Sequence, residues 1–291
     1  MYQLAILGEP LPDQVAQLEA LIAESVSCLG LRLGEDVGWH VKPEDFDPPQ
    51  VEAAAALFFG GVGAQLPESV MCRLRSLPII PIVSSPAGIR DELPEVLWSF
   101  NALVYGDVGP IRVATALLEC AGLLPRERRV FLSYRRDEAR VAALQLFDAI
   151  SARQYDVFLD THRIAPGDDF QATLWHRLCE SDVLVMLDTP GYFASRWTAA
   201  EYGRALAKNI SVLRIGWPGV IASPRTQTAS GLPLSEDDVD RRSGLLSESA
   251  LSTICYQLEV VRSQSIAVRR LNLISRVAGE LERVGGKVDG I

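Results

Sequence analysis

The sequence has no long hydrophobic run: no stretch approaches the ~18–20 continuous apolar residues that a membrane-spanning helix requires. Residues 1–8 form only a short apolar segment with no basic region before it, so no signal peptide is expected. Histidine is scarce, with 3 residues in 291, and no two cysteines have the C-x-x-C spacing of a zinc site. We therefore expect no metal centre.

Positive charge is also in deficit, with 28 Lys and Arg against 37 Asp and Glu and a net charge of −9. This balance disfavours nonspecific binding to nucleic acid or to an anionic membrane. The cysteines are odd in number, far apart and set in apolar segments, which predicts buried, reduced thiols in a cytoplasmic protein. They are Cys28, Cys72, Cys120, Cys179 and Cys255.

Residues 1–125 alternate short apolar runs with helical patterns, which predicts a mostly parallel sheet covered by helices on both faces. Strands are expected at 2–7, 55–59, 79–83 and 102–105, and helices at 13–28, 67–77 and 111–123. The glycine-rich stretch 60–63 is not followed by Lys-Ser or Lys-Thr, so we interpret it as a turn and not as a phosphate-binding loop.

A polar connector at 124–129 precedes a second alternating segment. Strands are expected at 130–134, 157–159, 183–187 and 210–215, helices at 138–153, 170–180 and 196–208, a long loop at 217–247, and a helix from 249 to about 284. We predict an α/β protein with an N-terminal domain at 1–125, a second domain at 126–262 and a C-terminal helical extension at 263–291. That extension could pack on the first domain or on another subunit.

Three segments of the second domain carry a recognisable pattern in the right order. Residues 130–136 form an apolar strand ending in Ser-Tyr-Arg-Arg, residues 156–167 form a strand and a loop ending in Ile-Ala-Pro-Gly, and residues 181–201 end in a Trp-x-x-x-Glu motif. Together they resemble the TIR (Toll/interleukin-1 receptor) domain: its first strand, its second strand with the BB loop, and its fourth strand with the following helix. The resemblance does not extend to residues 1–125.

The resemblance implies a flavodoxin-like parallel sheet for the second domain, and the first domain resembles a receiver-like or degenerate TIR-like fold. The chain departs from the family at Thr198, where many relatives have Cys, and at Asp188, where many have Ser. Neither departure replaces the motif tryptophan or glutamate. Only Glu9 lies near the end of the first strand, which disfavours a phosphoacceptor function for the N-terminal domain.

Polar residues follow the predicted strands of the second domain. Ser133, Arg135 and Arg136 follow the first strand, Asp160 follows the second, and residues 188–195 follow the fourth. Because the carboxyl ends of parallel strands meet at one edge, these residues are expected to converge there. The two arginines offer forked donors suited to a diphosphate, although a solvated turn is the alternative.

Trp197 and Glu201 are four residues apart and therefore share one helix face. A carboxylate beside an aromatic wall suits cleavage of the nicotinamide–ribose bond of NAD+, because it can stabilise the oxocarbenium-like ribose and accept hydrogen bonds from its hydroxyls. The alternative is a surface Glu201 paired with Arg204 and a Trp197 anchored in the core.

Some TIR domains cleave NAD+ to nicotinamide and ADP-ribose or a cyclic isomer, and others only self-associate. The resemblance implies an NAD+ glycohydrolase or cyclase, with NAD+ as substrate and no other cofactor, in bacterial antiphage defence or signalling. It implies Glu201 as the catalytic carboxylate, head-to-tail self-association through the loop at 164–167, and a substrate pocket formed by Ser133, Arg135, Arg136, Asp160, Gly167 and Trp197. The alternative is a non-enzymatic TIR scaffold.

Overall fold

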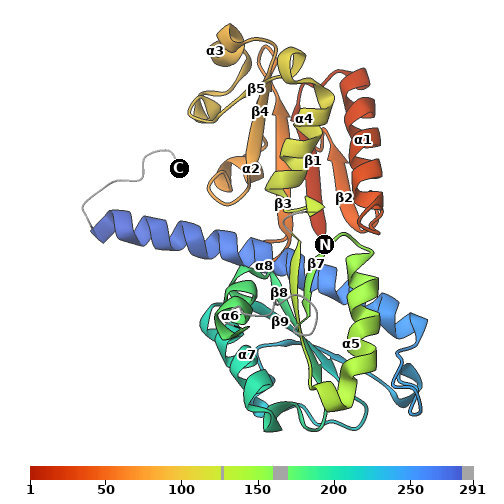
Figure 1. Ribbon diagram of the computed structural model, residues 1–291. Coiled ribbons are helices and arrows are strands. Elements are labelled where there is room, and N and C mark those ends of the chain that lie inside the picture. The colour runs from red at the N-terminus through yellow and green to blue at the C-terminus, as the bar shows by residue number, and fades with distance from the viewer. Residues whose placement is uncertain (126–127, 160–169, 284–291) are drawn as a thin grey trace. The chain divides into compact units, whose positions relative to one another are not determined.

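The computed structural model describes residues 1–125, 128–159 and 170–283. The chain divides into two compact units, Pro125–Ser265 and Met1–Leu124 together with the chain from Ile266 onward (Figure 1). Each unit contains one five-stranded sheet in which every strand pairing is parallel. The α/β class, the two flavodoxin-like sheets and the C-terminal helix are therefore confirmed.

The first unit has the strand order β2-β1-β3-β4-β5. Its strands are β1 (Tyr2–Gly8), β2 (Val37–Val41), β3 (Ala53–Phe59), β4 (Ile79–Val83) and β5 (Leu103–Val104), and its helices are α1 (Pro12–Ser27), α2 (Glu68–Cys72), α3 (Ile89–Glu92) and α4 (Tyr105–Cys120). All seven residues of the central strand β3 are buried, as expected for a strand covered on both faces. One apolar cluster joins α1 and α4 to the sheet, and another includes Val70 of α2.

Strand β2 was not predicted, because its sequence gives only a weak signal. Only Val37 of this strand is buried, and Gly38 and His40 interrupt the apolar pattern at the edge of the sheet. Helix α4 begins before the predicted position 111. Its first turn is broken at Gly109, whose φ of 72° is left-handed, and the regular helix follows Pro110.

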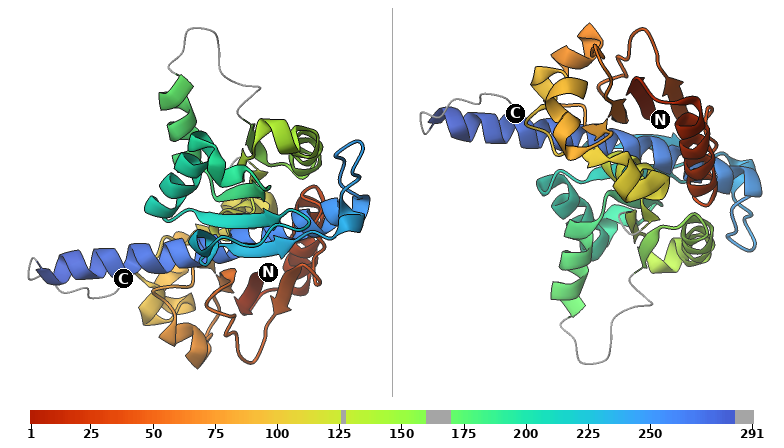
Figure 2. Two further views of the ribbon diagram at one scale, coloured as in Figure 1. Left: turned by 90° about the horizontal axis from the view of Figure 1, so that it is seen from below. Right: turned by 90° about the horizontal axis from the view of Figure 1, so that it is seen from above.

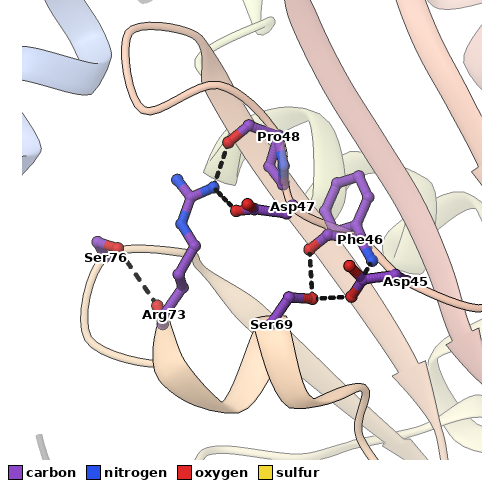
Figure 3. A network of polar contacts seen from close by, with 7 residues as sticks. All are labelled: Asp45, Phe46, Asp47, Pro48, Ser69, Arg73 and Ser76. Carbon is purple, nitrogen blue, oxygen red and sulfur yellow. Dashed lines mark hydrogen bonds and ion pairs between the residues drawn. The ribbon is translucent and has the colours of Figure 1, made fainter.

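The loop after β2 is fixed to α2 and the turn that follows it by polar contacts (Figure 3). The Ser69 hydroxyl donates to Asp45 and, at 3.2 Å, to the backbone carbonyl of Phe46. Arg73 donates to Asp47 at 3.0 Å. These contacts hold the Phe46 side chain in the apolar core beneath the loop.

The second unit has the strand order β10-β9-β8-β6-β7. Its strands are β6 (Arg129–Ser133), β7 (Asp156–Leu159), β8 (Val183–Asp188), β9 (Ser211–Gly216) and β10 (Ser230–Pro233), and its helices include α5 (Arg136–Ser151), α6 (Phe170–Glu180) and α7 (Arg196–Ala207). Counted from its own first strand, this order is 2-1-3-4-5, as in the first unit and in flavodoxin-like folds generally.

The strand before the Trp-x-x-x-Glu helix is the third of its sheet and not the fourth, so that prediction is wrong. The fifth strand, β10, lies inside the segment 217–247 that was predicted as a loop. It escaped prediction because it is short, contains Gly231 and Pro233, and pairs on one side only. An edge strand tolerates proline because one of its sides needs no backbone donor.

Helix α8 (Glu248–Arg283) is one continuous helix (Figure 2). Its residues up to Ser265 belong to the second unit, where Ile254, Leu258 and Val261 pack in the cluster that also contains α5. Its residues from Ile266 onward belong to the first unit. Among the helices of the described residues, none combines the length and apolar character that crossing a membrane requires.

Two buried ion pairs fix α8 to the amino-terminal edge of the β6–β10 sheet. Arg128, just before β6, is fully buried and makes a two-pronged contact with Glu259 of α8, with Nη1 3.3 Å from Oε2. Arg262 of α8 donates to Asp182, just before β8, at 2.7 Å. Charges taken out of water require such partners, so these pairs specify where the helix sits on the sheet.

The predicted burial of the cysteines is wrong for most of them. Cys255 of α8 is buried, and burial raises the pKa of its thiol. Cys28, Cys72 and Cys179 are exposed, and Cys120 is partly exposed. These four lie at or just beyond the last turn of a helix, where an apolar periodicity no longer guarantees contact with the core.

Replacing Glu259 with alanine removes the carboxylate that compensates the buried Arg128 charge. We expect the free energy of unfolding to fall by about 3–5 kcal/mol, measured by urea unfolding followed by circular dichroism. Removing both charges, in Arg128→Met combined with Glu259→Leu, should restore most of that loss, because no unpaired charge then stays buried.

Glu180→Ala is the matched control. Glu180 pairs at 3.4 Å with Arg129, the neighbour of Arg128, but both side chains are about one-third or more exposed. An exposed pair contributes at most about 1 kcal/mol. If Glu259→Ala and Glu180→Ala lowered the free energy of unfolding equally, burial would not be what makes the Arg128–Glu259 pair important.

Candidate active site

A cavity of ≈ 620 Å³ opens at the carboxyl-terminal edge of the sheet in the second unit. This is the edge at which parallel sheets bind ligands, and the volume suits a small molecule. Of the predicted site residues that the structure describes, four line it. The lining residues are Tyr134, Arg135, Arg136, Asp137, Leu174, Ser195, Trp197, Thr198 and Glu201.

Glu201 lies in the middle of α7 and is only 5% exposed. Its Oε2 accepts a hydrogen bond from the Ser133 hydroxyl at 2.5 Å. Arg204, the partner proposed for a surface carboxylate, instead stacks over the ring of Trp175 at 4.9 Å. The interpretation of Glu201 as a surface residue is therefore wrong, and its carboxylate borders the cavity from a buried position.

Ser133, at the end of β6, is buried and is not among the described residues that line the cavity. Its Oγ lies 2.6 Å from the hydroxyl of Tyr192, in the short 3-10 helix Tyr192–Ala194 that follows β8. Tyr192 is fully buried. Its pKa is raised well above 10 by burial and then by the negative charge of Glu201, so its hydroxyl keeps its proton.

Trp197 is 43% exposed and lies one turn before Glu201 on α7. The guanidinium of Arg196 stacks on its ring at 4.6 Å. The alternative of a core anchor is therefore wrong, and the indole forms a partly exposed wall of the cavity.

Arg135 holds the turn after β8. Its Nη1 donates to the Gly191 carbonyl at 3.0 Å and pairs with Glu138 at 3.2 Å, while Glu138 accepts from the Gly191 N–H at 2.9 Å. A Cβ at position 191 would lie 1.6 Å from Arg135 Nη1, so this contact requires glycine. Arg136 is exposed at the start of α5, just before Ala139, whose non-helical φ of −136° interrupts the helix.

Asp188 and Arg214 form a buried ion pair at the carboxyl ends of β8 and β9, with Arg214 Nε 2.5 Å from Asp188 Oδ2. This pair gives the Asp188 carboxylate a buried partner. Sequence reasoning missed Arg214 and the role of Tyr192. The one available signal was the single charge within the apolar strand 211–216, which requires a buried partner.

Asp160, Gly167 and the loop at 164–167 lie outside the described residues, so their predicted roles stay predictions. Within the described residues, no group of three or more His, Cys, Asp or Glu side chains is placed to hold a metal ion.

Comparisons with known proteins identify the family of the domain that contains the cavity. The TIR domain family matches residues 130–242. The comparison with curated proteins gave no match. Among solved structures, the C-terminal domain of glucosamine-fructose-6-phosphate aminotransferase from Francisella tularensis is 10% identical, with a TM-score of 0.30 and coverage of 91% of this chain and 84% of that one.

A protein assigned as a tagatose-6-phosphate ketose/aldose isomerase from Clostridium novyi NT is 11% identical, with a TM-score of 0.25 and coverage of 94% and 79%. Such low scores give no information on what this chain binds. The family match spans β6 to β10 and therefore includes the cavity, its tryptophan and its glutamate. The chain therefore contains a TIR domain, which lies at residues 130–242 of the second unit.

Proposed function

We propose that this TIR domain cleaves the bond between nicotinamide and ribose in NAD+, with Glu201 as the catalytic carboxylate. The products are nicotinamide and either ADP-ribose or its cyclic isomer. The observation that carries the proposal is the buried carboxylate of Glu201, which borders a cavity at the carboxyl edge of the sheet. A buried carboxylate facing a cavity suits a ligand on which positive charge develops.

The reaction makes a specific demand on the protein. When the bond between ribose C1′ and the nicotinamide nitrogen breaks, its electron pair goes to the nitrogen and neutralises the pyridinium. Positive charge then grows on C1′ and the ring oxygen, until water or a nucleophilic adenine nitrogen adds there and a proton is lost. A fixed carboxylate stabilises this charge more strongly in a poorly hydrated site than in water.

The other lining residues fit the remaining parts of the substrate. Trp197 offers a flat, partly exposed surface on which an aromatic ring can stack. Arg136, at the first turn of α5, suits the diphosphate. Arg135 lines the cavity and also holds the turn at Gly191. Asp160 and Gly167 are proposed for the pocket from the family resemblance alone.

We also propose that the domain self-associates through the segment 164–167, and that its role lies in bacterial antiphage defence or signalling. Both proposals rest on the family resemblance. Because assembly can be required for activity, the enzyme should be assayed at high concentration and with a crowding agent as well as in dilute solution.

Glu201→Gln keeps the size of the side chain and removes its charge. We expect nicotinamide release from NAD+, followed by liquid chromatography, to fall by on the order of 10²–10³-fold or more. Glu180→Gln is the control, because it makes the same chemical change on α6, away from the cavity, and should leave the rate unchanged.

Equal turnover by the wild type and Glu201→Gln would exclude this glutamate as the catalytic carboxylate. Absence of turnover in the wild type under both assay conditions would favour the non-enzymatic scaffold. Size-exclusion chromatography of the same samples would then show whether the domain self-associates.

Trp197→Ala should raise the KM for NAD+ by about 5- to 150-fold, because stacking of a base on an aromatic ring contributes roughly 1–3 kcal/mol. The melting temperature should change little, because the indole is 43% exposed. Trp98→Ala is the matched control: Trp98 is 41% exposed and also lies under an arginine, Arg90, but belongs to the first unit. An unchanged KM in Trp197→Ala would remove the tryptophan from the substrate site.

A further inference from the structure

Three buried side chains from three elements meet behind the cavity. Ser133 Oγ lies 2.5 Å from Oε2 of Glu201 and 2.6 Å from the hydroxyl of Tyr192. They come from β6, α7 and the 3-10 helix after β8. None of the three is more than 5% exposed, so bulk water does not compete for these hydrogen bonds.

The donor and acceptor of both hydrogen bonds can be assigned. The Ser133 hydroxyl donates to Oε2 of Glu201. Having used its one proton, the Ser133 oxygen can only accept from Tyr192. Tyr192 can serve as that donor because burial and the charge of Glu201 keep its pKa well above 10.

Tyr192 is itself held in place. Its backbone carbonyl accepts a hydrogen bond from Thr198 on α7, and its ring meets that of Phe193 edge-on with centroids 5.2 Å apart. The Tyr192 hydroxyl therefore has a defined position. It acts on Glu201 through the Ser133 hydroxyl, which lies between them.

We infer that Tyr192 and Ser133 are positioning residues: two hydroxyls in series that orient the Glu201 carboxylate and stabilise its charge. They act through Glu201 and do not contact the substrate. The inference rests on the proposed function only for its catalytic consequence, because the hydrogen-bond chain is a property of the folded protein.

The direction in which the pKa of Glu201 should change follows from the two hydroxyl donors. Hydrogen bonds to the charged form lower the pKa of a carboxyl, so removing them raises the pKa of Glu201. Further charged groups surround the site, and all stay in place in the variants below. Among the described residues they are Arg135, Arg136 and Asp137 of the turn into α5 at the cavity, and the Asp188–Arg214 pair of β8 and β9, whose carboxylate acts on Tyr192.

The test is a direct titration of Glu201 in the full chain. Carbon-13 NMR of the glutamate side-chain carboxyls gives each pKa, and the spectrum of Glu201→Gln identifies the resonance. We expect Ser133→Ala to raise the pKa of Glu201 by on the order of one pH unit, since it removes a direct donor. Tyr192→Phe should raise it by less, because Tyr192 acts through Ser133.

Tyr202→Phe is the matched control. Tyr202 is buried on the same helix as Glu201, and its hydroxyl donates to the backbone carbonyl of Arg225 at 2.6 Å. The variant loses a buried tyrosine hydroxyl, as Tyr192→Phe does, but that hydroxyl is not hydrogen-bonded to Ser133 or Glu201. We therefore expect the pKa of Glu201 in Tyr202→Phe to match that in the wild type.

The double variant Ser133→Ala with Tyr192→Phe should shift the pKa no further than Ser133→Ala alone, because the second hydroxyl then has no route to the carboxylate. An unchanged pKa in Ser133→Ala would overturn the inference, and so would a double variant whose shift is the sum of the two single shifts.

The enzymatic consequence is a separate measurement. The acid limb of kcat/KM for nicotinamide release should move to higher pH in Tyr192→Phe and not in Tyr202→Phe, because the carboxylate is ionised over a narrower pH range. If the pKa moves as expected but no variant, including the wild type, cleaves NAD+, the hydrogen-bond chain stands and the proposed function fails.

Discussion

The hydrogen bond between Ser133 and Glu201 is the contact on which the site depends. It joins the end of β6 to the middle of α7, and it gives a buried carboxylate a partner inside the protein. Burying a polar group is costly unless it is hydrogen-bonded, so this contact helps to hold the Glu201 side chain at the cavity. The hydrogen bond from Ser133 thus allows a buried carboxylate to line the cavity.

The sequence predicted the elements that carry a clear apolar pattern. Strand β8 reads as an unbroken apolar run, and α8 has a sustained helical periodicity, so both were located within a residue or two. Strands β2 and β10 were missed because each lies at the edge of its sheet and pairs with one neighbour. A strand buried on few positions leaves little apolar pattern in the sequence, and its pairing depends on segments far away in the chain.

The residues of the site likewise fall into those that a sequence pattern predicted and those that it did not. Arg135, Arg136, Trp197 and Glu201 could be placed at one cavity from the motif and from the rule that carboxyl ends of parallel strands converge. Tyr192 was placed at this edge only as part of the segment 188–195, and its role could not be predicted because it depends on a hydroxyl 59 positions earlier in the sequence. The environment of each residue was equally hidden: a buried glutamate beside an exposed tryptophan reverses the usual preference of both residue types.

The two units share a strand order but not this chemistry. In the first unit, Gly8 ends β1 with a φ of 77°, and a Cβ there would lie 2.0 Å from the carbonyl oxygen of Phe59, so the backbones of β1 and β3 approach closely at this point. The nearby charges, Glu9 and Lys42, pair at 2.8 Å with both side chains about half exposed. At the corresponding end of β6, Ser133 contacts two buried side chains, Tyr192 and Glu201, and one of them is an acid. The shared strand order gives both sheets a similar carboxyl-terminal edge, and the side chains at the strand ends determine which function that edge can have.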